Sequence, residues 1–255
     1  MTEALRLDQA LVARGLADTI PRALGLIAAG EVLVDECPCD KPATRIRPEQ
    51  AVRLRSEPMK YVSRGGLKLK AALDTWPVPV EGRVCVDLGA STGGFTDCLL
   101  QRGARRVYAI DVGYGQLAWK IRQDPRVVVM ERTNARHVDA LAEPATLLVA
   151  DLSFISLTLV LPTIRRLLAP EGDAVLLIKP QFEVGRADVG KGGLVRDDVA
   201  IATAVEGVLH EAQIHGFGVR ASRMSPLTGA KAGNREWLVW LGPPASACDI
   251  VEVPR

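Results

Sequence analysis

Cysteine is scarce in this sequence, and its placement limits the metal and disulfide chemistry that the chain can support. The 255 residues include five cysteines, and Cys37 and Cys39 flank Pro38 without a second pair at the spacing of zinc ligands. We interpret these two cysteines as turn residues. The three histidines form no plausible ligand set either. The sequence therefore predicts neither a disulfide framework nor a metal site.

Long apolar runs are also lacking. The longest, such as 174–178, fall far short of the roughly 20 residues that cross a bilayer. No basic start leads into an apolar stretch, so no signal peptide is predicted. Hydrophobic residues make up 48% of the chain and charged residues 24%, as in ordinary proteins with a packed core. We therefore expect a cytoplasmic protein without a membrane partner.

The net charge of +2 conceals an uneven distribution along the chain. Residues 1–40 contain three basic and seven acidic side chains, whereas residues 41–70 contain nine basic and two acidic ones. A basic segment between acidic and nearly neutral ones is typical of contact with nucleic-acid phosphates. A solvated charged face is the alternative interpretation.

The first 59 residues have the pattern of a small α+β domain. Apolar residues at helical spacing predict a helix over 5–16, and Pro21 with a cap near Thr19 predicts the start of a second. Short strands are expected at 32–34 and 51–54.

From about residue 82 onward, short apolar strands alternate with amphipathic helices, which predicts a parallel sheet covered on both faces. Strands are expected at 83–87, 106–111, 126–130, 146–151 and 174–179, and helices at 94–102, 115–122, 156–169 and 197–215. We assign residues 82–255 to this domain and residues 60–81 to a basic linker and the domain's first helix. Ligands of such sheets bind at the carboxyl ends of the strands.

A glycine-rich loop, DLGASTGGFT at 87–96, follows the first of these strands. Glycine lets the backbone turn sharply and approach a ligand closely, but the spacing is not the G-x-G-x-x-G of dinucleotide enzymes. Asp111 ends the second strand and Asn134 follows the third, so both are expected at the ligand-binding end of the sheet. Taken singly, a strand-ending aspartate is more often a helix cap or a turn residue.

Two parts of the chain resemble known domains. The text around Arg6-Leu7-Asp8 and Ala29-Gly30-Glu31-Val32 resembles the RNA-binding domain named for ribosomal small-subunit protein S4. The glycine-rich loop resembles the first motif of class I methyltransferases, and Lys68, Asp151, Lys179 and Glu236 resemble the tetrad of FtsJ-like ribose 2′-O-methyltransferases. With "STGGFTD", "DLSFISL" and "KPQFEVG", the whole chain resembles the TlyA (hemolysin-A-like) family.

The resemblance implies an α/β class I (Rossmann-like) methyltransferase with a mostly parallel seven-stranded sheet. It also implies 2′-O-methylation of cytidine in ribosomal RNA, of the large subunit and in some members of the small one, with S-adenosylmethionine as cofactor. Asp87 would stabilise the cofactor's ammonium group through the loop or a water. Asp111 would accept hydrogen bonds from the two ribose hydroxyls of the cofactor, and Asn134 would lie at its adenine edge. The expected cofactor-binding residues are Asp87, Gly89, Ala90, Ser91, Gly93, Gly94, Phe95, Asp111, Asn134 and Asp151.

A ribose hydroxyl is a poor nucleophile at neutral pH, so it must lose its proton as it attacks. No catalytic histidine or cysteine is evident, which leaves lysine as the available base. We expect Lys179 to act on the hydroxyl and Asp151 to orient it. Lys68 and Glu236 would hold the ribose and tune the charge. Taken alone, Lys179 could be a surface lysine at a strand end.

The expected partner is ribosomal RNA or a ribosomal subunit. The second predicted helix contains a single basic residue, Arg22, fewer than is usual in S4-type domains. The segment 183–196 is either a loop over the RNA cleft or a simple flexible connection. The residues expected to contact RNA are Arg6, Arg22, Arg45, Arg47, Arg64, Arg186 and Lys191.

Three other functions are compatible with parts of the pattern. A catalytically silent ribosome-assembly factor would keep the fold but not the activity. A membrane-active hemolysin, suggested by the family name, lacks an inserting segment. A small-molecule methyltransferase leaves the N-terminal module and the basic segment unexplained.

Overall fold

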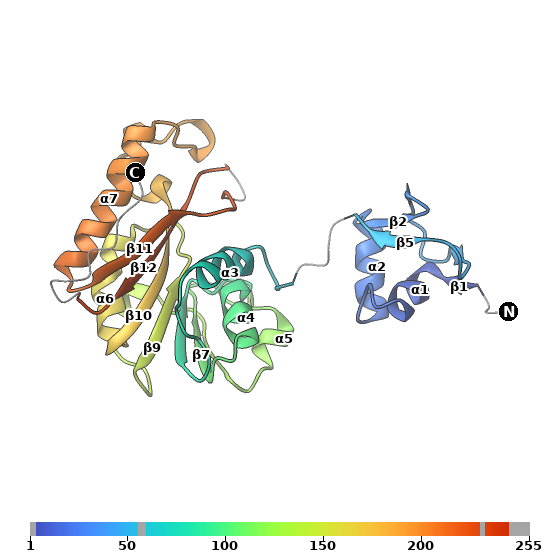
Figure 1. Ribbon diagram of the computed structural model, residues 1–255, viewed down its shortest axis with the longest axis horizontal. Helices are drawn as coiled ribbons and strands as arrows, with labels where there is room; N and C mark the ends of the chain where they lie inside the picture. Colours follow the sequence, from blue (N-terminus) through green and yellow to red (C-terminus); the bar gives the residue numbers. More distant parts are fainter. Residues whose placement is uncertain (1–3, 56–59, 230–232, 245–255) are drawn as a thin grey trace. The chain divides into compact units, whose positions relative to one another are not determined.

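The computed structural model describes residues 4–55, 60–229 and 233–244 and divides into two compact units, Met1–Met59 and Lys60–Arg255 (Figure 1). Each unit has a hydrophobic core of its own. We describe them separately as the N-terminal unit and the C-terminal unit.

The N-terminal unit combines two helices with short strands. Its elements are β1 (Leu5–Arg6), α1 (Leu7–Ala13), α2 (Ile20–Ala28), β2 (Val32–Val34), β3 (Cys37–Pro38), β4 (Arg45–Ile46) and β5 (Val52–Leu54). Strands β3, β2 and β5 form an antiparallel sheet in that order, and β1 pairs with β4. The predicted start of the second helix is confirmed, because the Thr19 side chain accepts a hydrogen bond from the Arg22 amide and Pro21 lies in the first turn.

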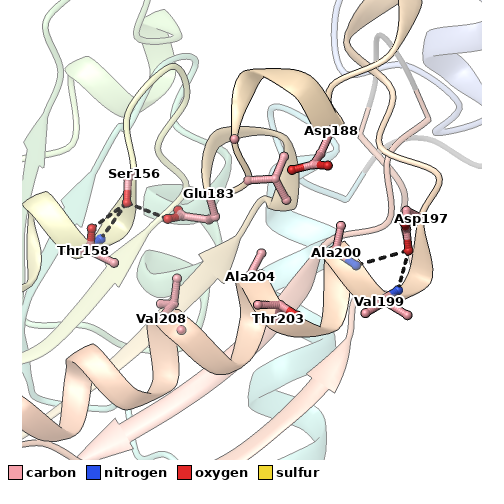
Figure 2. A pocket seen from close by; sticks show the side chains of 13 residues that line it. Ser156, Thr158, Glu183, Asp188, Asp197, Val199, Ala200, Thr203, Ala204 and Val208 are labelled. Carbon is pink, nitrogen blue, oxygen red and sulfur yellow. Dashed lines mark hydrogen bonds between the residues drawn. The ribbon is translucent and has the colours of Figure 1, made fainter.

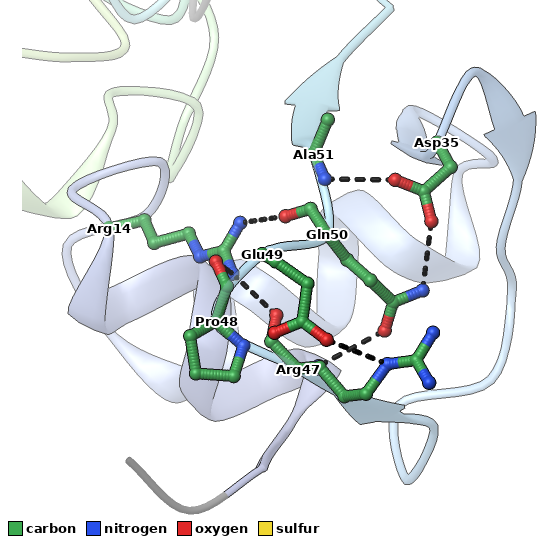
Figure 3. Close-up of polar contacts among 7 residues, drawn as sticks. All are labelled: Arg14, Asp35, Arg47, Pro48, Glu49, Gln50 and Ala51. Atoms are coloured by element: carbon green, nitrogen blue, oxygen red, sulfur yellow. Dashed lines mark hydrogen bonds and ion pairs between the residues drawn. The ribbon is translucent and has the colours of Figure 1, made fainter. Parts of the chain in front are cut away.

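Polar contacts hold the loop between β4 and β5 in shape (Figure 3). The Arg14 guanidinium donates to three carbonyl oxygens of this loop, those of Arg47, Pro48 and Gln50, and the bond to Gln50 O measures 2.6 Å. On the other side, Asp35 accepts hydrogen bonds of 2.9 Å from Gln50 Nε2 and from the Ala51 amide. The loop that presents Arg47 is therefore tied to both α1 and the β2–β3 turn.

The C-terminal unit is built on a seven-stranded sheet. Its strands are β6 (Val84–Leu88), β7 (Arg106–Ile110), β8 (Val127–Met130), β9 (Ala145–Ala150), β10 (Leu168–Ile178), β11 (Gly218–Met224) and β12 (Trp237–Gly242). They lie in the order β11-β12-β10-β9-β6-β7-β8, and β12 runs antiparallel to both of its neighbours while the pairs from β10 to β8 are parallel. The expected mostly parallel seven-stranded sheet is confirmed.

Helices cover both faces of this sheet (Figure 1). They are α3 (Gly65–Thr75), α4 (Gly94–Gln101), α5 (Trp119–Arg122), α6 (Leu161–Leu167) and α7 (Asp198–Ile214). Side chains of α3, α4 and α5, such as Leu69 and Leu99, pack in one core layer, and those of α6 and α7, such as Ile164 and Val208, pack in the other. No described helix is long and apolar enough to cross a membrane.

Short 3₁₀ turns fill several connections. They are η1 (Ala135–His137), η2 (Leu157–Leu159), η3 (Pro180–Phe182), η4 (Arg186–Asp188) and η5 (Lys191–Gly193).

Two predicted helices differ from the structure. The helix expected over 115–122 begins only at Trp119, because the chain before it is irregular and Gly115 has a φ of 69°. The stretch expected to be helical over 156–169 divides into η2 and α6. Pro162 occupies the first turn of α6, where its missing N–H is tolerated, and it does not allow one continuous helix. Strand β10 then starts at Leu168, six residues earlier than expected.

Candidate active site

The tertiary structure brings a buried lysine and a buried glutamate into contact. Lys68 lies on α3, and Glu236 immediately precedes β12. Lys68 Nζ lies 2.5 Å from Glu236 Oε2, and both residues are less than a tenth exposed. Charged groups are rarely buried unless they are paired, and this pair meets that condition.

A second ion pair joins the ends of two neighbouring parallel strands, β9 and β10. Lys179 Nζ lies 2.6 Å from Asp151 Oδ1, close enough for an ion pair although the angles are not those of a hydrogen bond. The same ammonium group donates a hydrogen bond of 2.9 Å to Ser153 Oγ. The Lys179 amine is therefore held by two groups of the segment that follows β9.

The strand register places these two pairs at the same side of the sheet, where the parallel strands have their carboxyl ends. Ile178 on β10 lies opposite Trp237 on the antiparallel β12, so the next residues towards this side are Lys179 and Glu236. Since β9 runs parallel to β10, Asp151 emerges at the same side. All four predicted tetrad residues therefore lie at the carboxyl end of the parallel strands, which is the ligand-binding end of such sheets.

Small residues let α3 lie directly on α4. A Cβ atom built on Gly94 would be 2.2 Å from Ser63 Oγ and 2.9 Å from the Gly66 amide nitrogen. A Cβ built on Gly65 would lie 3.7 Å from Asp151 Oδ2. The first turn of α3, which precedes Lys68, is therefore packed against both the glycine-rich loop and the Asp151 carboxylate.

The glycine-rich loop has the backbone shape that its glycines predict. Gly89 has a φ of 81°, and a Cβ there would approach the Asp151 carbonyl oxygen to 2.8 Å. Ser91, with a φ of 48°, donates its amide hydrogen to Asp111 Oδ2 at 2.8 Å, while Asp111 Oδ1 accepts from the Gly113 amide at 2.7 Å. Asp111 thus shapes the loop, and its oxygens retain lone pairs for further donors.

Asp87 is the most unusual carboxylate of this region. It is fully buried, and its Oδ2 accepts hydrogen bonds from the Thr96 amide and hydroxyl at 2.9 and 2.7 Å. Its Oδ1 is buried and has no hydrogen-bond partner among the residues described. Burial, with smaller effects of Asp151 and Asp111, raises the pKa of Asp87 to about 7. An unpaired buried carboxylate oxygen beside a loop of glycines fits a ligand with a cationic amine.

The remaining predicted cofactor residues differ in their surroundings. Ala90 and Phe95 are buried, and the Ala90 amide donates to the Ile110 carbonyl. Asn134 is exposed and its side chain accepts from the Arg136 amide, so it caps η1. It follows Thr133, whose amide donates to the Asp111 carbonyl. Asn134 is therefore next in sequence to a residue that contacts Asp111, and its own side chain is hydrogen-bonded to the Arg136 amide.

The residues expected to contact RNA are all exposed: Arg6, Arg22, Arg45 and Arg47 in the N-terminal unit, and Arg64, Arg186 and Lys191 in the C-terminal unit. Four of them already have protein partners. The Arg6 guanidinium pairs with Asp8 at 2.8 Å and that of Arg47 with Glu49 at 3.2 Å, while Arg45 donates to the Ala4 carbonyl and Arg64 to the Thr228 carbonyl. Within the described parts of the chain, no three histidine, cysteine or acidic side chains cluster as metal ligands would.

Sequence reasoning missed two residues of this region, Ser153 and Glu183. Ser153 holds the Lys179 amine, and Glu183 accepts hydrogen bonds from Ser156 and Leu157. Glu183 also lines a cavity of about 540 Å³ between α7, η2 and the 183–188 turn (Figure 2). Ser153 lies in the motif "DLSFISL" and Glu183 in "KPQFEVG". Their polar side chains, close in sequence to Asp151 and Lys179, were the signal by which they could have been found.

Comparison with known proteins matches both units. The model of the FtsJ-like methyltransferase family matches residues 61–243, and the S4 domain model matches residues 5–52. The chain is 48% identical to the 16S/23S rRNA (cytidine-2′-O)-methyltransferase TlyA of Mycobacterium tuberculosis, over 94% of this chain and 91% of the relative.

Two solved structures extend the comparison. A candidate hemolysin from Streptococcus thermophilus is 40% identical, with a TM-score of 0.73 over 96% of this chain and 90% of that one. The N-methyltransferase NodS of Bradyrhizobium japonicum, in complex with S-adenosylhomocysteine, is 16% identical with a TM-score of 0.51 over 71% of this chain and 86% of that one, and it shares the fold.

Proposed function

Because the chain belongs to the family of FtsJ-like methyltransferases, we propose that it transfers a methyl group from S-adenosylmethionine to the 2′-hydroxyl of a cytidine in ribosomal RNA. The observation that supports this most is the meeting of two lysine–carboxylate pairs at the strand ends beside the glycine-rich loop. The name of the Mycobacterium tuberculosis relative supports the choice of ribosomal RNA as substrate.

Lys179 is the group that acts on the ribose hydroxyl. Its amine is the one held by Asp151 and Ser153. Once the ammonium form has released a proton to solvent, the neutral amine takes the hydroxyl proton, and a general base of this kind accelerates a transfer by roughly 10²- to 10⁴-fold. The fixed position of the amine also avoids an entropic cost at the moment of attack. Lys68 and Glu236 hold the ribose and keep the local charge balanced.

The cofactor is held by the loop after β6. When bound, S-adenosylmethionine supplies the methyl group on a sulfonium centre. Asp87, whose Oδ1 has no hydrogen-bond partner among the described residues, stabilises the ammonium group through the loop or a water. Asp111 accepts the two ribose hydroxyls, and the backbone of Gly89 and Gly93 provides the close approach. Asn134 contacts the adenine edge.

The N-terminal unit binds RNA. The S4 match and the exposed arginines of this unit support this role, since arginines that contact phosphate position a protein on RNA without selecting sequence. We assign residues 1–59 to RNA binding, 60–81 to the linker and first helix, and 82–255 to methyl transfer. Ribosomal subunits in the cytoplasm are the proposed substrate.

One experiment separates this function from its alternatives. The purified chain, labelled S-adenosylmethionine and isolated ribosomal subunits should yield a 2′-O-methylated cytidine that can be mapped on the RNA. Binding to subunits without any labelled ribose would indicate the silent assembly factor instead. Leakage of dye-filled liposomes would indicate the hemolysin, which the structure does not favour because no described helix can cross a membrane.

A further inference from the structure

We propose that Glu183 is a positioning residue of this methyltransferase, which ties the loop containing Asp151 to the turn containing Lys179. The inference rests on the proposed function, because it assumes that Asp151 and Lys179 act on the substrate. The loop, residues 151–157, follows β9, and the turn, residues 179–183, follows the neighbouring parallel strand β10.

Both carboxylate oxygens of Glu183 bind the far end of the loop, and Figure 2 shows the contact with Ser156. Oε2 accepts a hydrogen bond of 2.6 Å from Ser156 Oγ, and Oε1 accepts one of 2.9 Å from the Leu157 amide. Hydrogen bonds to an ionised carboxylate are about twice as strong as those between neutral groups. One side chain of the turn thus fixes two successive residues of the loop.

The loop needs such a tie because its backbone is strained. Phe154 has a φ of 65° and is 83% exposed. A bulky residue in the left-handed region is strained and persists only where its surroundings enforce it. The Asp151 amide holds the start of the loop by donating to the Leu88 carbonyl at 3.1 Å. Glu183 holds the end.

The residues between these two attachments contact the proposed base. Ser153 Oγ accepts the hydrogen bond from Lys179 Nζ, and the Phe154 ring lies 5.3 Å from the Phe182 ring. If the end of the loop moves, the oxygen that holds the Lys179 amine moves with it. Glu183 therefore acts on the reaction through Ser153 and Asp151 and not through contact with the substrate.

The surroundings of Glu183 favour a role in which its carboxylate positions other residues. The residue is partly buried at the wall of the cavity, and burial raises its pKa while the Ser156 and Leu157 donors oppose that rise. A plain capping role is the competing explanation, because Leu157 begins η2. A cap would affect stability alone, whereas a positioning residue also affects turnover.

The test compares Glu183→Ala and Glu183→Gln with the wild-type full chain on ribosomal subunits. In Glu183→Ala, kcat should fall by about 30-fold while the Kd for S-adenosylmethionine changes by less than about twofold, because misplacement of a reacting group by an ångström costs up to about 100-fold. Glu183→Gln should recover most of kcat, since the amide oxygen still accepts from Leu157 and the amide nitrogen can donate to Ser156. Ser156 Oγ would then donate to Thr158 Oγ1, which lies 2.7 Å away.

Two further variants keep the inference testable. Asp188→Ala removes a carboxylate that lines the same cavity and should leave kcat unchanged. Ser156→Ala breaks one of the two bonds and should lower kcat by about threefold, with no additional loss in the double variant with Glu183→Ala; it decides the question if Glu183→Ala does not fold. If the wild type is active and a folded Glu183→Ala or Ser156→Ala variant is equally active, the inference about Glu183 is overturned and the proposed function is not. A wild type that transfers no methyl group would overturn the proposed function.

Discussion

Lys68 Nζ lies 2.5 Å from Glu236 Oε2, although 168 residues separate the two in the chain. The lysine belongs to the first helix of the C-terminal unit and the glutamate to the approach to its last strand. Their contact joins the two ends of the unit at the edge where Asp151 and Lys179 also lie. Stability and activity should therefore both respond to changes at this pair.

Breaking the pair from one side should destabilise the protein more than removing it altogether. Lys68→Met leaves a buried carboxylate unpaired and should lower the free energy of unfolding by about 3 kcal/mol. In the double variant with Glu236→Gln, part of this loss should be regained. Urea unfolding of the single and double variants measures the coupling. Lys70→Met, on the same helix with an exposed ion pair to Asp74, is the matched control and should change stability by less than about 1 kcal/mol.

Lys179→Ala should abolish methyl transfer while leaving cofactor binding nearly intact. The loss in kcat should be at least about 100-fold, because the variant removes the proposed base. Transfer of labelled methyl groups to ribosomal subunits gives kcat, and calorimetry gives the Kd for S-adenosylmethionine. Lys70→Ala again serves as the control. Turnover close to that of the wild type in Lys179→Ala would refute the role assigned to this amine.

The stability of the unliganded protein should fall as pH rises, because of Asp87. Its pKa is raised to about 7 in the folded state by burial, above the value of about 3.8 in an unfolded chain. The folded state therefore binds this proton more tightly than the unfolded chain does. The bound proton stabilises the folded protein fully below about pH 4, and this contribution is lost progressively up to about pH 7. Between pH 4.5 and pH 8 the expected loss is roughly 3 kcal/mol. Chemical unfolding at pH 4.5 and pH 8 should show it in the wild type.

Asp87→Asn supplies the comparison for this pH dependence. The asparagine side chain can still accept from Thr96 but does not titrate, so the difference in stability between the two pH values should shrink by the same amount. Equal slopes in wild type and variant would mean that Asp87 keeps an ordinary pKa in the folded protein.

Gly94→Ala should separate α3 from α4. Its Cβ would meet Ser63 Oγ, which can rotate away, but also the Gly66 backbone nitrogen at 2.9 Å, which cannot. Overpacking of this kind costs about 1–3 kcal/mol, and the cofactor should bind more weakly because Gly94 belongs to the glycine-rich loop. Gly207→Ala is the control: nothing lies within 4 Å of its Cβ on α7, so the variant should gain roughly 0.5–1 kcal/mol. Thermal unfolding with and without S-adenosylmethionine compares the two.

Features that depend on neighbouring residues were predicted from the sequence. The structure has the predicted cap at Thr19, and most strands and helices of the predicted alternation lie within a few residues of their expected bounds. Caps and hydrophobic periodicity depend on residues close together in the sequence, which is why they could be predicted. The family resemblance supplied the tetrad in advance. The bounds of α5 and α6 were wrong, since an irregular stretch near Gly115 and the position of Pro162 outweighed the apolar spacing.

The sequence by itself determined the order of elements, the glycine spacing of the loop and which polar residues end the strands. The tertiary structure decided which of those residues meet: Lys68 with Glu236, and Lys179 with Asp151 and Ser153. It also decided that Asp87 keeps one oxygen without a partner in the described part of the chain and that Glu183 bridges two loops. These facts depend on strand register and on burial, which arise from contacts between segments far apart in the chain, and no local pattern encodes them.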